Sequence, residues 1–370
     1  MIESIKFANY RAFKDEGNLV LKPVTLLIGR NSSGKTSLCR LIHFVSMVNN
    51  LDVWSSDDSS IICSSSDFSD LFFKRMRLGL VIGADYESGA AFTTHYYLDE
   101  QNGMKVSFRS VRNGNDESID SDVEKLRRGS NSVIDDALLR EVGLSSVTFH
   151  FDVTHINSIR TMAKEVYRQS EARDVTTVGG DGAVSYPLLL SSFLKKSSLI
   201  ENVAKWMNDK LDGQRLDIID SLDNYEFRIK RAGNSVKIQD VGQGISQILP
   251  IIVQTFIQKP NSITIVEEPE LHLHPSAHAV VMERIAYSAI QSGSKYVVET
   301  HSENMLLAVR RMVSRGELNP KDVSIAYIEM DEEMGHAAVR SIEIDSNGML
   351  NWWPSGVFSE SYDLLNDILI

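Results

Sequence analysis

The spacing of apolar and polar residues changes character near residue 245. Before that point, short apolar runs alternate with polar turns. An alternating run over residues 2–7 predicts a first strand, and a second strand follows a polar turn. The apolar run 24–28 predicts a buried strand, and a helical period follows it to about Val48. Three β-rich runs then predict an antiparallel meander at residues 77–84, 91–98 and 105–112.

Between the meander and residue 245 the pattern is mixed. A Ser/Asp-rich stretch over residues 49–67 predicts a loop. A tight turn around Gly233 predicts a hairpin. The helical patterns cover residues 121–142 and 187–211, and the strand-like runs cover 147–152, 225–231 and 235–239.

After residue 245, helix and strand patterns alternate regularly, which favours an α/β sheet with helices on its faces. The predicted elements are helices at 248–257, 277–290 and 303–313 and strands at 263–266, 296–299 and 323–328. A short hairpin is expected after Asp331. The chain then has an aromatic segment, which we expect to pack on the edge of a sheet: Trp352, Trp353, Pro354 and Phe358.

Composition narrows the class of protein. The chain has 370 residues, of which 42% are hydrophobic, so it can bury a large core. Its two cysteines, Cys39 and Cys63, lie in no ligand or disulfide spacing, which indicates a reducing compartment. No apolar run approaches the roughly 20 residues of a membrane span. We therefore expect a cytoplasmic protein that has no membrane partner.

The charge balance argues against general adhesion to nucleic acid. Lys and Arg total 38 against 50 Asp and Glu, which gives a formal net charge of -12. Local basic clusters remain candidates for DNA contact, although a solvated charged face is the ordinary reason for such a cluster. The three clusters are Lys74, Arg75 and Arg77; Lys125, Arg127 and Arg128; and Arg310, Arg311 and Arg315.

A complete phosphate-binding motif, GxxxxGK[ST], follows the apolar run 24–28 directly. Its glycines let backbone N–H groups curl around phosphates, Lys35 reaches the β- and γ-phosphates, and Thr36 offers a hydroxyl to Mg²⁺. A helix beginning near Lys35 adds its N-terminal dipole. The expected ATP-binding residues are Gly29, Arg30, Asn31, Ser32, Ser33, Gly34, Lys35, Thr36 and Ser37.

Paired carboxylates end the predicted strand 263–266. A carboxylate at Glu267 can hold Mg²⁺, and Glu268 can orient or deprotonate the attacking water. Glu270 is expected to have a structural role. His301 follows the next strand and is predicted to contact the γ-phosphate. His272, His274 and His278 have a spacing that superficially suggests a metal site, but a structural role is expected because they directly follow the acids.

The order of four motifs resembles that of ATP-binding-cassette ATPases of the RecF, SMC and OLD group. The motifs are the phosphate loop, the segment 241–247, Glu-Glu-Pro-Glu-Leu-His-Leu-His-Pro and Glu-Thr-His-Ser. The aromatic end resembles a small domain of unknown function found in some stand-alone bacterial ATPases. The resemblance implies an α/β fold with a mixed sheet core, an antiparallel meander lobe and a helical insertion. Its implied division is an N-terminal ATPase part at 1–48, the lobe and insertion at 49–240, a C-terminal ATPase part at 241–330, and a small aromatic segment at 331–370.

The same resemblance implies two subunits that sandwich two ATP molecules with Mg²⁺. Residues 271–275 would be the D-loop, His301 the switch histidine, and Arg11 would lie near the nucleotide. A signature loop would act on the partner's ATP through Gly242, Gly244 and Ser246. Three features depart from the family pattern: Glu267 stands where aspartate is usual, the signature reads Gly-Gln-Gly-Ile, and no Q-loop glutamine is evident.

The lengths of two segments distinguish this chain from the SMC and OLD proteins that it resembles. Thr36 and Gly242 are separated by 205 residues that show no sustained heptad pattern, unlike the long arms of SMC chains. Only 69 residues follow His301, without the acidic constellation of an OLD nuclease domain. We therefore expect an ATPase that controls an associated effector protein encoded nearby, plausibly a nuclease in a bacterial antiphage system. The alternative is a RecF-like clamp that binds DNA when ATP closes the dimer.

Overall fold

The computed structural model describes residues 1–48, 67–98, 104–114, 116–120, 151–222 and 224–358. The loop predicted at 49–67, except for its last residue, the helix predicted at 121–142 and the cluster Lys125, Arg127 and Arg128 lie outside these residues. The chain forms two compact units: unit 1 contains Met1–Val153 and Ser324–Ile342, and unit 2 contains Thr154–Val323 and Glu343–Ile370. These boundaries differ from the four predicted segments. Each unit is described by itself.

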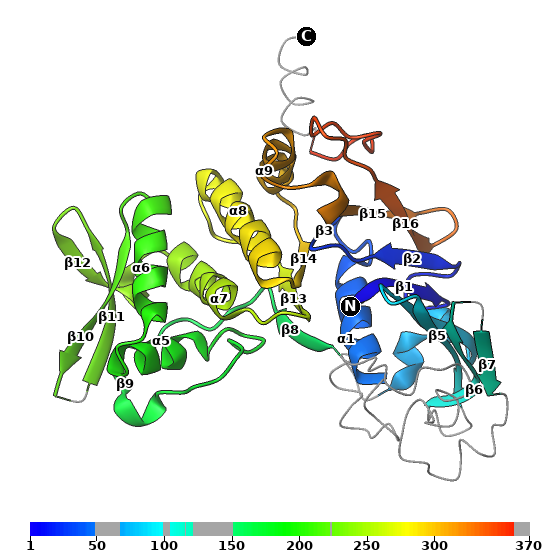
Figure 1. The fold of residues 1–370 in the computed structure, drawn as a ribbon, viewed down its shortest axis with the longest axis horizontal. Helices are drawn as coiled ribbons and strands as arrows, with labels where there is room; N and C mark the ends of the chain where they lie inside the picture. The colour runs from blue at the N-terminus through cyan, green and yellow to red at the C-terminus, as the bar shows by residue number, and fades with distance from the viewer. Residues whose placement is uncertain (49–66, 99–103, 115, 121–150, 223, 359–370) are drawn as a thin grey trace. The chain divides into compact units, whose positions relative to one another are not determined.

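Unit 1 contains a six-stranded antiparallel sheet (Figure 1). Its strand order is β2-β1-β4-β5-β6-β7. The predicted meander is therefore confirmed, but it continues into the N-terminal strands because β1 pairs with β4. The strands are β1 (Ile2–Ala8), β2 (Gly17–Val20), β4 (Leu78–Tyr86), β5 (Ala90–Leu98), β6 (Met104–Asn113) and β7 (Asp116–Asp120).

One of the remaining strands of unit 1, β3 (Val24–Gly29), leads into the phosphate loop. It is buried at all six positions, as expected for a strand covered on both faces. It lies next to β15 (Val323–Asp331), which forms an antiparallel hairpin with β16 (His336–Ile342). The turn and second strand of this hairpin follow Asp331, whereas its first strand is β15 itself, so the predicted hairpin begins earlier than expected. Helix α1 (Lys35–Val48) follows β3, and two short 3-10 turns, η1 (Phe68–Leu71) and η2 (Phe73–Arg75), precede the meander.

Unit 2 contains the parallel strands β13 (Ser262–Glu267) and β14 (Lys295–Glu299), both buried throughout. β8 (Asp152–Ile156) lies beside β13. The sequence placed this strand at 147–152, so its end was predicted four residues too early. The difference matters because the polar residues that follow β8 belong to the site described below.

In the described part of unit 2, each of the five helices from α5 to α9 packs against the next one along the chain. They are α5 (Ser185–Leu194), α6 (Ser198–Lys210), α7 (Gln243–Ile257), α8 (Pro275–Ser292) and α9 (Glu303–Ser314). Local chemistry sets the ends of α8: His274 caps its first turn, Pro275 stands at the first helical position, and Gly293 ends it in the left-handed conformation (φ 65°). Within the described residues, no helix combines the length and apolar character needed to cross a membrane.

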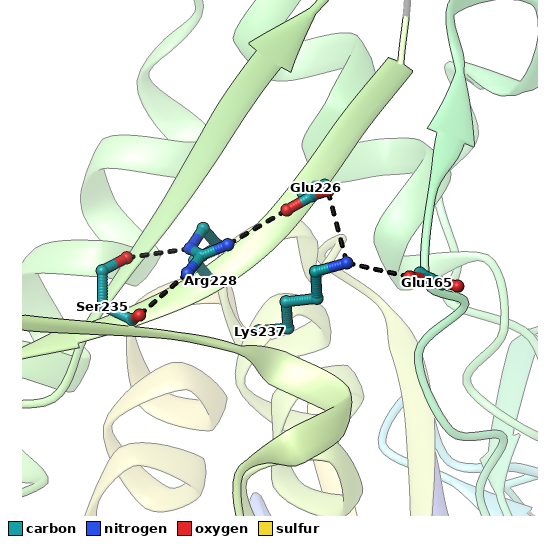
Figure 2. A network of polar contacts seen from close by, with 5 residues as sticks. All are labelled: Glu165, Glu226, Arg228, Ser235 and Lys237. Carbon is teal, nitrogen blue, oxygen red and sulfur yellow. Dashed lines mark hydrogen bonds and ion pairs between the residues drawn. The ribbon is translucent and has the colours of Figure 1, made fainter.

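A small antiparallel sheet precedes the signature segment. Its strands are β9 (Tyr167–Arg168), β10 (Arg215–Ser221), β11 (Asn224–Arg231) and β12 (Asn234–Lys237), followed by the 3-10 turn η4 (Ile238–Asp240). β11 and β12 form the predicted hairpin. Figure 2 shows how ion pairs tie this sheet to the chain before β9: Lys237 bridges Glu226 on β11 and Glu165, and Arg228 contacts Glu226 and Ser235.

The aromatic segment packs differently from the expectation of a sheet edge. Trp353 donates from its indole N–H to the Val357 carbonyl at 2.9 Å and stacks on Phe358. Together with Leu306 and Leu307 of α9, these rings line a cavity of 390 Å³. The segment therefore lies against a helix, because α9 offers an apolar face there.

Candidate functional site

The phosphate loop, residues 29–36, has the strained backbone that its spacing predicts. Ser32 (φ 61°) and Gly34 (φ 108°) lie in the left-handed region, which glycine enters without a steric penalty. A Cβ on Gly34 would lie 3.1 Å from the Phe13 ring and 3.7 Å from Ala12. Helix α1 begins at Lys35, as predicted. The strand, loop and helix thus aim backbone N–H groups at one point.

Lys35 is held inside this loop. The residue is only 3% exposed. Its Nζ donates to the carbonyls of Gly29 at 3.0 Å and Arg30 at 2.8 Å. The hydroxyl of Ser33 is buried and has no hydrogen-bond partner among the described residues. An anion with several oxygen atoms would accept a hydrogen bond from the Ser33 hydroxyl. The loop therefore fits the predicted phosphate ligand.

Arg11 lies in the segment that touches this loop. Its backbone N–H donates to Leu71, and its neighbours Ala12 and Phe13 lie against Gly34. Arg11 itself has a left-handed backbone (φ 49°). The predicted position near the nucleotide is consistent with this neighbourhood, and its role stays a prediction.

The acid residues of unit 2 follow β13 as the sequence predicts. Glu267 is 8% exposed, whereas Glu268 is half-buried. Glu268 has a left-handed backbone (φ 41°), which is unusual for a residue other than glycine. Its N–H donates to the Glu299 carbonyl of β14 at 2.8 Å. Strain of this kind persists where surrounding contacts enforce it, and it is common at functional sites.

The end of β8 and the residues that follow it contact the Glu267 carboxylate. His155 Nε2 lies 2.9 Å from Oε1, and the Ser158 N–H donates to Oε2 at 3.3 Å. Glu267 is therefore fixed by contacts from a segment more than a hundred residues away in sequence. This arrangement suits an acid that must hold one orientation at the end of a buried strand.

Arg160, which follows β8, contacts the backbone of the same acids. The residue is 2% exposed, and its Nη2 donates to the carbonyls of Glu267 and Glu268. Burial lowers the pKa of Arg160 to about 10, and the carboxylates of Glu270, Glu267 and Glu268 oppose that shift. The guanidinium therefore stays positively charged at neutral pH and offsets part of the negative charge of the acids.

Glu270 has the structural role that was expected. Its Oε1 accepts hydrogen bonds from the Thr300 hydroxyl at 2.8 Å and from the His301 N–H at 2.6 Å. Burial raises the pKa of this carboxyl. Glu270 thereby anchors the turn that presents His301, whose side chain is exposed. The contact with a γ-phosphate that was predicted for His301 stays a prediction.

The end of β13 and β14 also offers ligand atoms for a cation. One ligand atom from each of Glu268, Glu299 and His301 lies within 4.8 Å of the others. The two carboxylate oxygens suit Mg²⁺, whereas the imidazole of His301 is not a usual ligand of that ion. Thr36 belongs to unit 1 and Glu267 to unit 2, so their joint role as Mg²⁺ ligands stays a prediction.

Two of the three histidines that follow the acids, His274 and His278, have structural contacts. His274 Nδ1 lies 2.8 Å from Ser276 Oγ and caps α8. His278 contacts the Ser302 hydroxyl at 2.8 Å and the Leu273 carbonyl at 3.3 Å. These contacts support the expectation that their spacing reflects structure.

The predicted signature residues differ in their surroundings. Gly242 is exposed and occupies the cap position before α7, with nothing within 4 Å of the place where a Cβ would stand. A Cβ on Gly244 would lie 2.7 Å from the His272 carbonyl of the predicted D-loop. Ser246 is fully buried, and its hydroxyl contacts the Ile238 carbonyl at 3.5 Å. Ser246 therefore has a contact within its own chain, which argues against direct contact with a partner's nucleotide.

We expect Gly244→Ala to destabilise unit 2. The added methyl group would force the α7 backbone away from His272, and overpacking of this kind costs about 1–3 kcal/mol. Denaturant unfolding of the purified protein measures the loss. Gly242→Ser is the matched control, because that position has open space and serine is a favoured helix cap. Equal stability of the two variants would contradict the close approach.

Sequence reasoning missed three residues of this site: His155, Arg160 and Gln247. Gln247 on α7 accepts from the Arg160 N–H at 3.2 Å and donates to the Arg160 carbonyl at 2.8 Å. One signal was present in the sequence, since His155 stands near the end of β8 and Arg160 follows that strand by four residues. The misplaced end of β8 hid it.

Comparisons with known proteins agree with this architecture. Residues 24–308 match the family described as "AAA domain, putative AbiEii toxin, Type IV TA system", and residues 318–368 match a family described as "Protein of unknown function (DUF3696)". The second match confirms the resemblance of the aromatic end to a small domain of unknown function. No curated protein shows significant sequence similarity to the chain.

Three solved structures of SMC heads resemble the fold. An SMC head bound to the C-terminal winged-helix domain of ScpA is 14% identical, with a TM-score of 0.50, 92% of this chain and 98% of that chain covered. An SMC head from Thermotoga maritima is 11% identical, with a TM-score of 0.44 and coverages of 93% and 99%. A head with an extended coiled coil, bound to a ScpA domain derived from Pyrococcus furiosus, is 14% identical, with a TM-score of 0.43 and coverages of 100% and 99%.

The first of these likenesses supports the predicted fold class, a mixed α/β ATPase fold of the ABC type. The family match spans the phosphate loop, the signature segment, the acids and His301. It indicates a nucleotide-dependent activity. The chain therefore belongs to the AAA-domain family that matches residues 24–308.

Proposed function

We propose that this protein hydrolyses ATP as a nucleotide-gated dimer and thereby controls an associated effector protein. The observation that carries the proposal is the acid end of β13, where Glu267 is fixed by His155 and Glu268 is left half-exposed. This acid pair occurs in one chain with a complete phosphate loop. Phosphate release by the purified protein with ATP and Mg²⁺ tests the proposal, and its absence would contradict it.

The roles of the residues follow from their chemistry. Lys35 and the backbone N–H groups of the phosphate loop bind and orient the β- and γ-phosphates. Thr36 and Glu267 would hold Mg²⁺, which neutralises phosphate charge when it is bound. Glu268 accepts a proton from the attacking water, and His301 contacts the γ-phosphate.

A dimer is proposed because the exposed signature loop stands before α7. Gly242 is open to solvent at the N-terminus of this helix, where backbone N–H groups and the helix dipole favour an anion. In the ATP sandwich proposed here, the anion is the γ-phosphate bound by the partner subunit. The exposed Gly242 is now a better candidate for this contact than Gly244 or Ser246.

We expect Gly242→Asp to leave the isolated chain stable while it slows ATP turnover about 10-fold or more. An aspartate at this cap position favours the helix by a few tenths of a kcal/mol relative to glycine. The same carboxylate would repel a γ-phosphate approaching from a partner. Unfolding and steady-state phosphate release, measured on one preparation, separate the two effects. Full activity of Gly242→Asp would exclude Gly242 from the signature contact.

Control of an effector is supported by two of the comparisons. The matched family's description names a toxin of a toxin–antitoxin system, and one SMC head of similar fold was solved with a partner domain bound. A regulated partner is therefore in keeping with both. We propose that the partner is encoded nearby and is a nuclease of an antiphage system, which co-expression with the neighbouring reading frames tests.

The alternative of a DNA clamp has weaker support. In the described part of the chain, Arg75 pairs with Asp70 at 2.8 Å, and Arg311 pairs with Glu283. Arg310 donates to the Gly348 carbonyl. These side chains have partners within the protein, as expected of structural charges. Binding of duplex DNA with ATP at physiological salt would instead favour the clamp.

A further inference from the structure

We propose that Arg160 is a positioning residue for Glu268, and that Gln247 of α7 holds Arg160 in place. The inference deepens the proposed function, since it rests on Glu268 acting in ATP hydrolysis. It starts from the strained backbone of Glu268, which determines where the carboxylate points.

Two hydrogen bonds hold Glu268 in this conformation. The Glu299 carbonyl accepts from its N–H at 2.8 Å, and its own carbonyl accepts from Arg160 Nη2 at 3.2 Å. The same Nη2 contacts the carbonyl of Glu267. Arg160 therefore fixes the peptide groups on both sides of the turn at the end of β13. Without it, a non-glycine residue would relax toward an ordinary backbone conformation.

Arg160 is itself fixed from a second element. Gln247, 7% exposed, makes two hydrogen bonds to the Arg160 backbone, one to its N–H at 3.2 Å and one to its carbonyl at 2.8 Å. Gln247 lies one turn into α7, the helix that Gly242 caps. The chain of contacts thus runs from the signature helix through Gln247 and Arg160 to the backbone of Glu268.

The burial of Arg160 is not explained by structural hydrogen bonding alone. Nε and Nη1 have no hydrogen-bond partner among the described residues, although the side chain is almost fully buried. A buried charge with unused donors is costly unless neighbouring charges compensate. The carboxylates of Glu267, Glu268 and Glu270 supply that compensation. The arginine is therefore tied to the acid group specifically.

Arg160→Met tests the inference. The substitution keeps a long buried side chain but removes the donors that hold Glu268. We expect kcat for ATP to fall about 10- to 100-fold, while KM and the affinity for a fluorescent ATP analogue change by less than about 3-fold. Arg160→Lys, which retains one charged donor, should recover part of kcat. Gln247→Met should lower kcat in the same sense by loosening Arg160.

The matched control is Arg284→Met on α8. Arg284 also donates two hydrogen bonds, one to the Thr255 carbonyl at 3.0 Å and one to the Thr255 hydroxyl at 2.9 Å. Burial also lowers its pKa. Among the described residues, no hydrogen bond or ion pair joins Arg284 to Glu267, Glu268 or Glu270. We expect a loss of thermal stability with kcat near the wild-type value. An equal fall in kcat for Arg160→Met and Arg284→Met would overturn the positioning role.

A second comparison shows whether Arg160 acts through Glu268. In a Glu268→Gln background, Arg160→Met should cause little further loss, because the group that it positions is already disabled. A full additional loss would contradict the inference. If Arg160→Met does not fold, Arg160→Lys and Gln247→Met give the same comparison. Wild-type kcat in either of these variants would also overturn it.

Failure of this inference can be told apart from failure of the proposed function. If wild-type protein releases phosphate and Glu268→Gln does not, the proposed function stands whatever Arg160 does. If Arg160→Met then matches wild type, only the positioning role is lost. If wild type and Glu268→Gln release phosphate equally, Glu268 is not the base and the positioning role fails, whereas ATP hydrolysis stands. If wild type releases no phosphate, the proposed function itself fails.

Discussion

Lys35→Ala is expected to abolish ATP binding at concentrations that saturate the wild type. The ammonium group is predicted to bridge the β- and γ-phosphates, and charged hydrogen bonds contribute about 1.5–3 kcal/mol each. Loss of two such bonds weakens binding by at least about 100-fold. Titration with a fluorescent ATP analogue measures the affinity directly, and phosphate release should disappear with it.

The structure adds a condition to this experiment. The carbonyls of Gly29 and Arg30 accept from Lys35 in the protein as described, so alanine leaves both without this donor. Thermal unfolding must therefore accompany the binding assay. Lys14→Ala is a suitable control because Lys14 is an exposed lysine of the same unit. Undiminished ATP turnover by a folded Lys35→Ala protein would refute the phosphate site.

Glu268→Gln should bind ATP normally and stall hydrolysis. The amide has nearly the shape of the carboxylate but cannot accept a proton from water, and loss of a general base typically slows the reaction by about 10²- to 10⁴-fold. The strained backbone should be unchanged, because its hydrogen bonds involve main-chain atoms. Single-turnover phosphate release measures the rate.

The stalled variant also tests the dimer. If two subunits enclose ATP, Glu268→Gln should accumulate as an ATP-dependent dimer, which light scattering detects. Glu317→Gln, an exposed acid of the same unit, serves as the control and should hydrolyse ATP at the wild-type rate. A strictly monomeric profile with ATP and Mg²⁺ would speak against the sandwich arrangement, whereas rapid hydrolysis by Glu268→Gln would exclude Glu268 as the base.

Several local features of the site were predictable because short-range chemistry fixes them. The phosphate loop is contiguous, and its glycines, Lys35 and Thr36 identify it without reference to the rest of the chain. The acids after β13 stand out for the same reason, since an apolar run ends in Glu267 and Glu268. The meander was evident from alternation and turns. Its joining to β1 was not, because strand pairing between distant segments leaves no periodic trace.

Helix α7 illustrates a limit of local pattern. The helical pattern predicts a start near Ile248, yet α7 begins at Gln243 and includes Gly244, a poor helix residue. Gly244 is tolerated because its missing side chain allows α7 to approach His272. Tertiary packing thus outweighs the cost of a glycine in the first turn.

By itself, the sequence determined the ATPase family of the protein, its α/β fold and the positions of the phosphate loop and of the acids, because each motif lies within a few residues of a recognisable strand end. Only the tertiary structure decided what holds those acids. His155 of β8 and Arg160 after it meet Glu267 and Glu268 across about a hundred residues of sequence, and Gln247 of α7 holds Arg160 by its backbone. Such contacts depend on the packing of whole elements, which no local pattern encodes.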